Sequence, residues 1–295
     1  MDPSTTADLV ESLVQLPEAP LAALFAGAGA RPPVVLWSPG NAALHQPLLR
    51  RFAALARNCA NPDDTLNRRD IDLAAFGDLT DWMAQLDYGP AAGELIYRHY
   101  GPGIARLKGR DMTGSAIAFE PHIRIFFTAV YEAVARARRP VLTEHQPPPD
   151  VFVHQWLRLI YPVSDGRSTA AAPLPVTGFL ALIYPENLLA PGLEAMADPV
   201  LVTDQELMVL FANHAARRQF DHGRSRSWRL PLFEYTGLDF APTVSARDLA
   251  DSGRVLAMRS HRVSGALLSR MAIRVSGLLH NGHAYYMLHA LPDAA

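Results

Sequence analysis

One order of predicted elements occurs twice in this sequence: two strands, a stretch with short helices, and then three strands. The three closing strands are predicted at residues 141–144, 152–163 and 176–184 in the first copy, and at 254–263, 266–277 and 283–291 in the second. Corresponding elements lie roughly 115 residues apart, which indicates a duplicated domain because solenoid repeats are far shorter. Antiparallel strands with helices gathered between them predict an α+β fold with the helices on one face of each sheet.

The chain divides into three predicted parts. Residues 1–66 form a mostly helical N-terminal region, residues 67–185 a first domain with a five-stranded antiparallel sheet, and residues 192–295 a second domain of the same kind. The clearest helix lies in the first domain, where apolar residues between Ile123 and Val134 recur at the spacing of one helix face. The dipeptide Asn281-Gly282 predicts a tight hairpin turn between the last two strands, because both residues tolerate a left-handed backbone.

Composition narrows the classes of function. Of the 295 residues, 49% are hydrophobic and 19% are charged, which supports packed cores and excludes wholesale disorder. No apolar run approaches the ~20 residues of a membrane-spanning helix. The net charge of −2 gives no bulk electrostatic reason to expect nucleic acid or a membrane surface as a partner. A single cysteine, Cys59, allows neither an internal disulfide nor a cysteine-rich metal site. We therefore expect a soluble, cytoplasmic protein.

The second domain resembles a PAS domain. A strand, an acidic turn, a second strand, an asparagine and a helix follow one another in the order in which a PAS domain opens, in segments 198–204, 207–213 and 215–220. The first domain is similar to a divergent bacterial PAS subgroup through segments 70–72, 95–101, 109–114 and 157–162. Together the two cover about two thirds of the chain. The second domain departs from the pattern at residues 221–244, which are arginine-rich and lack a clear long helix, so its pocket is expected to be incomplete.

This resemblance implies a bacterial sensor. PAS modules hold a cavity between the sheet and the middle helices, and they dimerise through the outer face of the sheet or an N-terminal helix. We therefore expect a homodimer with a possible small-molecule ligand and another signalling protein as its output, since no catalytic or DNA-binding motif follows the second domain. The ligand and any cofactor stay unidentified. The cavity of the first domain is expected to be lined by Tyr97, Arg98, Phe126, Val130, Leu157 and Tyr161.

Tyr97 and Arg98 are neighbours on a predicted strand, so their side chains point to opposite faces and one of them reaches the cavity. An arginine inside an apolar pocket needs a counter-charge. An acidic ligand would supply it, and so would an internal carboxylate such as Asp72 or Asp111, which is the simpler expectation.

The strand at 152–163 carries a second candidate surface. Leu157 and Tyr161 share one face of it, whereas His154, Trp156 and Arg158 share the other. Mixed aromatic and cationic groups are typical of interfaces. We expect this second face to be a dimer or partner surface, with an ordinary solvated sheet face as the alternative.

Other candidate chemistry is weak. His99, His145 and His154 fall on different strands, and His122 begins the long helix, without the spacing of a metal or haem site. The arginine cluster from Arg217 to Arg229 favours a solvated loop over a grip on nucleic acid or a phosphorylated partner. No nucleophile elbow, Walker loop or zinc motif occurs, so we expect no enzyme. The alternatives are a dimerisation scaffold with filled cavities and an enzyme of an unrecognised type.

Overall fold

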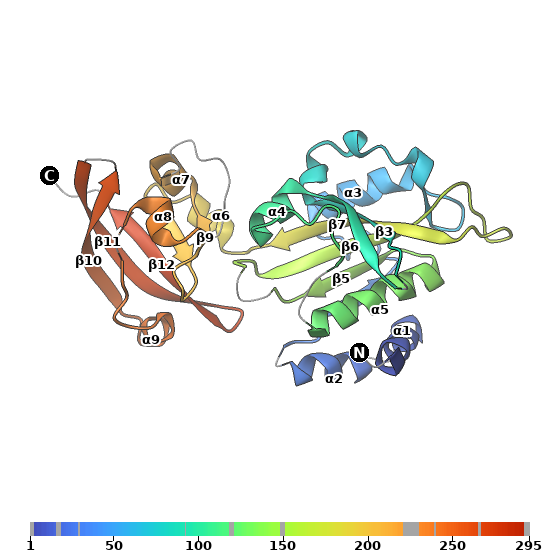
Figure 1. Ribbon diagram of the computed structural model, residues 1–295, viewed down its shortest axis with the longest axis horizontal. Helices are drawn as coiled ribbons and strands as arrows, with labels where there is room; N and C mark the ends of the chain where they lie inside the picture. Colours follow the sequence, from blue (N-terminus) through green and yellow to red (C-terminus); the bar gives the residue numbers. More distant parts are fainter. Residues whose placement is uncertain are drawn as a thin grey trace. The chain divides into compact units, whose positions relative to one another are not determined.

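The computed structural model describes residues 3–15, 19–28, 30–91, 93–117, 121–147, 151–220, 230–238, 240–264 and 267–291. Contacts divide the chain into two compact units. Unit 1 comprises Met1–Ala105, Arg110–Gln146 and Gln155–Pro185, and unit 2 comprises Arg106–Gly109, Pro147–His154 and Glu186–Ala295. Each unit is built on one β-sheet with helices (Figure 1).

The sheet of unit 1 has seven strands. The helices and strands up to residue 186 are α1 (Pro3–Gln15), α2 (Ala19–Gly27), β1 (Val34–Trp37), α3 (Pro47–Arg57), β2 (Leu66–Asn67), η1 (Arg68–Asp70), η2 (Leu73–Trp82), β3 (Met83–Tyr88), β4 (Leu95–Tyr100), α4 (Pro102–Lys108), α5 (Pro121–Ala137), β5 (Val141–His145), β6 (Gln155–Ser164) and β7 (Val176–Glu186). The strand order is β1-β5-β6-β7-β3-β4, and the short β2 pairs in parallel with β6.

Residues 1–66, which the sequence sets apart as a helical region, belong to unit 1 in the structure. The apolar segment Val34–Trp37 pairs antiparallel with β5 at the edge of the sheet. Leu66 and Asn67 pair with the end of β6. These two additions turn the expected five strands of this domain into seven.

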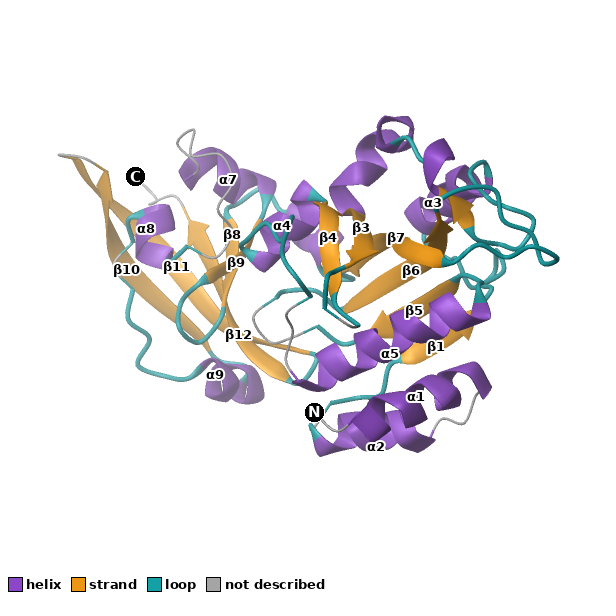
Figure 2. Ribbon diagram, turned by 45° about the vertical axis from the view of Figure 1, so that its right-hand side comes forward, coloured by secondary structure: helices purple, strands orange, loops and turns teal. Residues whose placement is uncertain are grey.

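Helices cover both faces of this sheet rather than the one face expected. On one face, Leu49 and Phe52 of α3 and Phe76 of η2 pack on β6 and β7 in a single apolar core. On the other face lies α5, whose buried side includes Phe127 and Val130. The helices α1 and α2 pack against α5 (Figure 2). The N-terminal region therefore supplies a layer to each side.

Residues 73–82, directly before β3, are not extended. Residues 73–82 form 3-10 turns, opened by Asp72, whose carboxylate accepts a hydrogen bond from the backbone N–H of Ala74 at 2.9 Å. Gly77 then breaks the run with a φ of +57°, a conformation that glycine adopts without cost. The extended backbone of β3 starts only at Met83.

Unit 2 repeats the strand order of unit 1. Its helices and strands are α6 (Ala190–Glu194), β8 (Val200–Thr203), β9 (Val209–Ala212), α7 (His214–Phe220), α8 (Leu232–Thr236), α9 (Ala246–Ser252), β10 (Val255–Ser264), β11 (Leu267–His280) and β12 (His283–Leu291). The order β10-β11-β12-β8-β9 matches β5-β6-β7-β3-β4 strand for strand. The prediction of two α+β copies with a shared element order is therefore confirmed.

The three helices α7, α8 and α9 pack over one face of this second sheet. Gly277 of β11 permits the closest approach, because a Cβ atom there would lie 2.2 Å from the carbonyl oxygen of Ala246 in α9. The hairpin turn predicted at Asn281-Gly282 is confirmed, with φ values of +53° and +80°. Within the described ranges, no helix is both long and apolar enough to span a bilayer.

Candidate functional site

A buried guanidinium lies where α5 meets the sheet of unit 1. Arg158 of β6 is only 4% exposed. Its guanidinium carbon is 3.9 Å from the centroid of the Phe127 ring, and its Nη1 donates to the hydroxyl of Tyr131 at 3.4 Å. Both partners are on α5. A cation over an aromatic face is attracted by the ring quadrupole, the more strongly where water is excluded.

Three tyrosine side chains lie near Arg158. Burial raises the pKa of Tyr97 and of Tyr131, and the positive charge of Arg158 opposes this rise. Burial also raises the pKa of Tyr100 to about 12 against the same charge. The rings of Tyr97 and Tyr100 are 4.9 Å apart between centroids. All three hydroxyl groups therefore stay protonated at neutral pH.

The structure divides the predicted cavity residues between two faces of the sheet. Tyr97, Phe126 and Val130 are buried. The positive charge of Arg158, in the layer under α5, acts to lower the pKa of the Tyr97 hydroxyl. Leu157 and Tyr161 belong instead to the core under α3 and η2, where the Tyr161 ring lies 5.9 Å from that of Phe52. Placing these two in one cavity with the α5 residues is thus wrong, because alternate β6 residues face opposite sides.

The prediction of an exposed interface on β6 is also wrong for two of its residues. Trp156 is 3% exposed and Arg158 is 4% exposed, since α5 covers the face that the sequence assigns to a partner. His154 precedes the strand and belongs to unit 2. It is half-buried, and its backbone N–H donates to the carbonyl of Glu186 at 2.7 Å.

The remaining histidine and cysteine candidates pack against, or lie within hydrogen-bond distance of, neighbouring residues of the fold. His99 Nε2 lies 3.0 Å from the carbonyl oxygen of Thr80, and the His145 ring packs 5.0 Å from that of Phe127. His122 packs edge-on against Phe25. Cys59 is buried, and burial raises the pKa of its thiol. Among the described residues, no group of three histidine, cysteine or acidic side chains is placed to hold a metal ion.

The arginine cluster of unit 2 is only partly described. Arg217 forms a two-pronged ion pair with Glu194, with nitrogen–oxygen distances of 2.8 and 3.0 Å. Arg224, Arg226 and Arg229 lie outside the described residues. Arg217 therefore joins α7 to α6.

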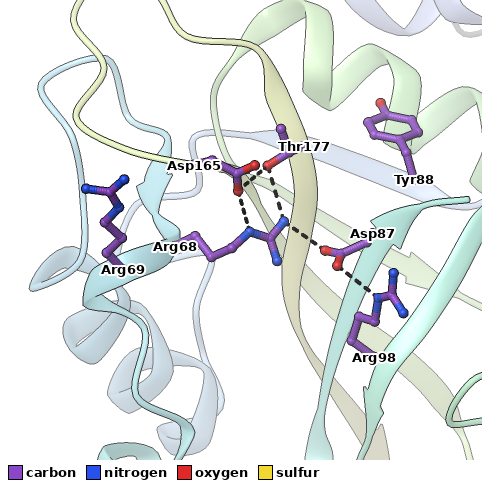
Figure 3. Close-up of a pocket in the computed structure, with 7 residues that line it drawn as sticks. All are labelled: Arg68, Arg69, Asp87, Tyr88, Arg98, Asp165 and Thr177. Carbon is purple, nitrogen blue, oxygen red and sulfur yellow. Dashed lines mark hydrogen bonds and ion pairs between the residues drawn. The ribbon is translucent and has the colours of Figure 1, made fainter.

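An open pocket of about 430 Å³ lies at one end of the unit 1 sheet (Figure 3). Its lining residues come from η1, β3, β4, β7 and the connection between β6 and β7: Arg68, Arg69, Asp87, Tyr88, Arg98, Asp165 and Thr177. Of these, the sequence singled out only Arg98, and for a different place. No spacing in the sequence could have found the group, because five separate segments contribute to it.

Ion pairs link four of these side chains in series, from Arg98 through Asp87 and Arg68 to Asp165. The Nε atom of Arg98 donates to Asp87 at 3.0 Å, and Asp87 faces the Nη2 atom of Arg68 at 2.8 Å. The Nε atom of Arg68 lies 2.5 Å from Asp165, whose carboxylate also accepts from the Thr177 hydroxyl at 2.8 Å. Burial alone would lower the pKa of Arg68, but hydrogen bonds to Asp165 and Asp87 outweigh it and raise that pKa.

A glycine makes room for this arrangement. A Cβ atom on Gly178 of β7 would lie 2.5 Å from the Asp87 carboxylate, 2.8 Å from Arg68 Nη2 and 2.4 Å from the Leu86 carbonyl. The hydrogen bond from Thr177 and the ion pair with Arg68 lower the pKa of Asp165, and burial opposes them. The Asp165 carboxylate therefore stays ionised at neutral pH.

No family model matches this chain, and no curated protein matches it. The solved structures similar to it are mostly PAS domains and sensory domains of chemoreceptors. The PAS domain of nitrogen regulation protein NR(II) from Vibrio parahaemolyticus is 19% identical, with 36% of this chain and 97% of that chain covered and a TM-score of 0.30.

Two chemoreceptor domains match over more of the chain. For the sensory domain of the Campylobacter jejuni chemoreceptor Tlp3, the identity is 11%, the coverage 99% of this chain and 98% of that one, and the TM-score 0.32. The ligand-binding domain of the Pseudomonas aeruginosa amino acid chemoreceptor PctC, solved with GABA, is 16% identical. The match covers 85% of this chain and 94% of that chain, with a TM-score of 0.30.

Proposed function

We propose that this protein is a regulatory sensor without a catalytic output of its own, and that unit 1 recognises a small molecule in the layer between α5 and the sheet. The observation that supports this most is the placement of Arg158, a buried cation held between β6 and two aromatic residues of α5. A few polar groups in an otherwise apolar layer are typical of small-molecule sites.

The mechanism that we propose is a population shift. A guanidinium carries five N–H donors, so an acceptor group on a ligand competes directly with the contacts that Arg158 makes to α5. A ligand that binds one arrangement of α5 more tightly than another shifts the balance between them by the ratio of the two affinities. Because α1 and α2 pack on α5, such a shift reaches the N-terminal helices.

The physiological setting is part of the same proposal. We expect a cytoplasmic homodimer that passes its state to another signalling protein, with neither a membrane nor nucleic acid as a partner. Light scattering coupled to size-exclusion chromatography measures the oligomeric state, and a monomer across the concentration range would rule out the homodimer.

Native mass spectrometry with an absorbance spectrum of the purified protein tests the sensing role. We expect a bound small molecule in the wild type, loss of that mass in Arg158→Met, and partial loss in Tyr131→Phe, which removes only the hydroxyl contact. The matched control is Arg136→Gln on the exposed side of α5, where this arginine pairs with Glu132. A bound mass that persists in Arg158→Met would overturn the assignment of this site.

A second candidate is a non-sensing dimerisation scaffold. The observation that favours it is the close packing of the same layer, where the rings of Tyr131 and Phe179 lie 4.8 Å apart and those of Phe126 and Phe127 lie 4.9 Å apart. Side chains packed to this degree leave the layer filled. A dimer that carries no bound mass and no visible absorbance in any variant would support the scaffold over the sensor.

A further inference from the structure

We propose that the pocket in Figure 3 is a second ligand site, which binds the carboxylate group of a small organic molecule through Arg98. This goes beyond the proposed function, because the binding group is Arg98 rather than Arg158.

The donors of Arg98 determine the kind of ligand. Its Nε atom is engaged by Asp87 at 3.0 Å, whereas within the described residues its two terminal nitrogens meet no acceptor, and the side chain is 56% exposed. Two terminal nitrogens in one plane present parallel N–H groups that match the two oxygens of a carboxylate. The guanidinium of Arg69, which lines the same pocket, also lacks an acceptor in the described part of the chain.

The chain of ion pairs holds Arg98 in place before any ligand arrives. Asp87 fixes its Nε side, Arg68 fixes Asp87, and Asp165 with Thr177 fixes Arg68. Each group in this series is oriented by the next, and the series is tied to η1 and to three strands of the sheet. An arginine that is already oriented loses less side-chain entropy when it binds.

Charge and shape favour a carboxylate over a dianion. Three arginines and two aspartates line the pocket, so it carries one excess positive charge that one carboxylate neutralises. A doubly charged phosphate would leave an uncompensated negative charge beside Asp87 and Asp165. The Tyr88 ring is 39% exposed, and its centroid lies 5.8 Å from that of the buried Phe179 ring. The exposed part of Tyr88 offers an apolar surface for the body of the ligand.

Isothermal titration calorimetry with benzoate tests this site, with benzamide as the neutral analogue of the same shape. We expect benzoate to bind the full-length wild type and benzamide to bind at least about tenfold more weakly, because the neutral amide cannot form the charge-assisted pair with Arg98. Arg98→Gln should lose at least about tenfold in benzoate affinity by the same reasoning. The matched control, Arg31→Gln, changes an exposed arginine of the same unit and should bind like the wild type.

Four outcomes would overturn the proposal. Equal affinity for benzoate in Arg98→Gln and wild type would remove Arg98 from the site. Equal binding of benzamide would show that charge is not recognised, and tighter binding of inorganic phosphate than of benzoate would exclude the carboxylate class. Loss of benzoate binding in Arg158→Met but not in Arg98→Gln would place the ligand under α5, which would sink this inference while supporting the proposed function. Thermal melting of each variant verifies that it is folded.

Discussion

Asn213 shows how much one buried side chain holds together in unit 2. Its Oδ1 atom accepts from the backbone N–H groups of Val200 and Ala216 at 3.0 and 2.9 Å. Its Nδ2 atom is 2.9 to 3.2 Å from the carbonyl oxygens of Leu193, Met196 and Asp198. One amide therefore joins the end of α6 and the segment after it to β8 and to the start of α7.

Replacing Asn213 with alanine leaves these backbone groups without their partner. Buried polar groups that lose a hydrogen bond cost about 1–3 kcal/mol each, so Asn213→Ala should lower the free energy of unfolding by about 3 kcal/mol. Urea denaturation followed by circular dichroism measures this. His214→Ala, one residue on and exposed, is the control. A midpoint equal to that of the control would show that water replaces the amide.

Gly178 is the second residue with a decisive role. In Gly178→Ala the new methyl group meets the Leu86 carbonyl and the Asp87 carboxylate at less than a van der Waals distance. We expect a loss of about 2 kcal/mol in unfolding free energy, as for other insertions into filled space. Gly192→Ala is the control, because a Cβ atom there meets nothing within 4 Å. Equal melting temperatures for the two variants would contradict the geometry.

Among the elements, the end of α5 is joined to the connection from β6 to β7 by one buried carboxylate, that of Asp63. The Asp63 side chain, 6% exposed, accepts hydrogen bonds from Arg138 and Ser168 at 2.6 Å each. Arg138 also donates to the carbonyl of Leu174. Burial raises the pKa of Asp63, but the hydrogen bonds from Ser168, Arg138 and Thr65 outweigh it and hold the pKa at about 2.

This pKa sets a direction for stability against pH. Because the folded pKa is below the unfolded value, the carboxylate contributes about 2 kcal/mol that is fully present above about pH 4 and is lost as the pH falls toward 2. Urea titrations of wild type and Asp63→Asn should therefore differ at pH 6 and converge only as the pH falls to about 2 and below. A difference that stays constant over this range would show that the ion pair does not stabilise the junction.

At the same scale, sequence patterns predict elements well and their faces less well. The period of α5 and the turn at Asn281-Gly282 carry unambiguous local signals, and both are found. On β6, every residue from Trp156 to Ser164 is buried, so the alternation of the strand has no polar side to mark which face meets α5. Arg158 is polar in the sequence and buried in the fold, because α5 supplies an aromatic partner that no local pattern reveals.

At the scale of the whole molecule, the duplication was predictable and the use of residues 1–66 was not. A short apolar run such as Val34–Trp37 shows that a strand exists, but its pairing with β5 depends on residues more than a hundred positions away. The charged pocket has the same origin, since its members approach one another only when β3, β4 and β7 take their places in one sheet. Long-range pairing of this kind leaves no periodic trace in a single sequence.

This dependence leads to a prediction about the N-terminal helices. Leu9, Val10 and Phe25 are nearly inaccessible to solvent, the Phe25 ring packs 5.6 Å from that of Phe126, and the Trp37 indole donates to the carbonyl of Leu13. Removing residues 1–33 uncovers the outer side of α5, so hydrogen exchange in peptides from α5 should accelerate strongly. Peptides from β11 and β12, whose core is formed within unit 2, should keep their protection.

Phe25→Ala should give a smaller effect of the same sign, because it removes one of these contacts. Unchanged exchange in α5 after the truncation would mean that the sheet alone holds this helix, and the route proposed from Arg158 to the N-terminal helices would then have no structural basis.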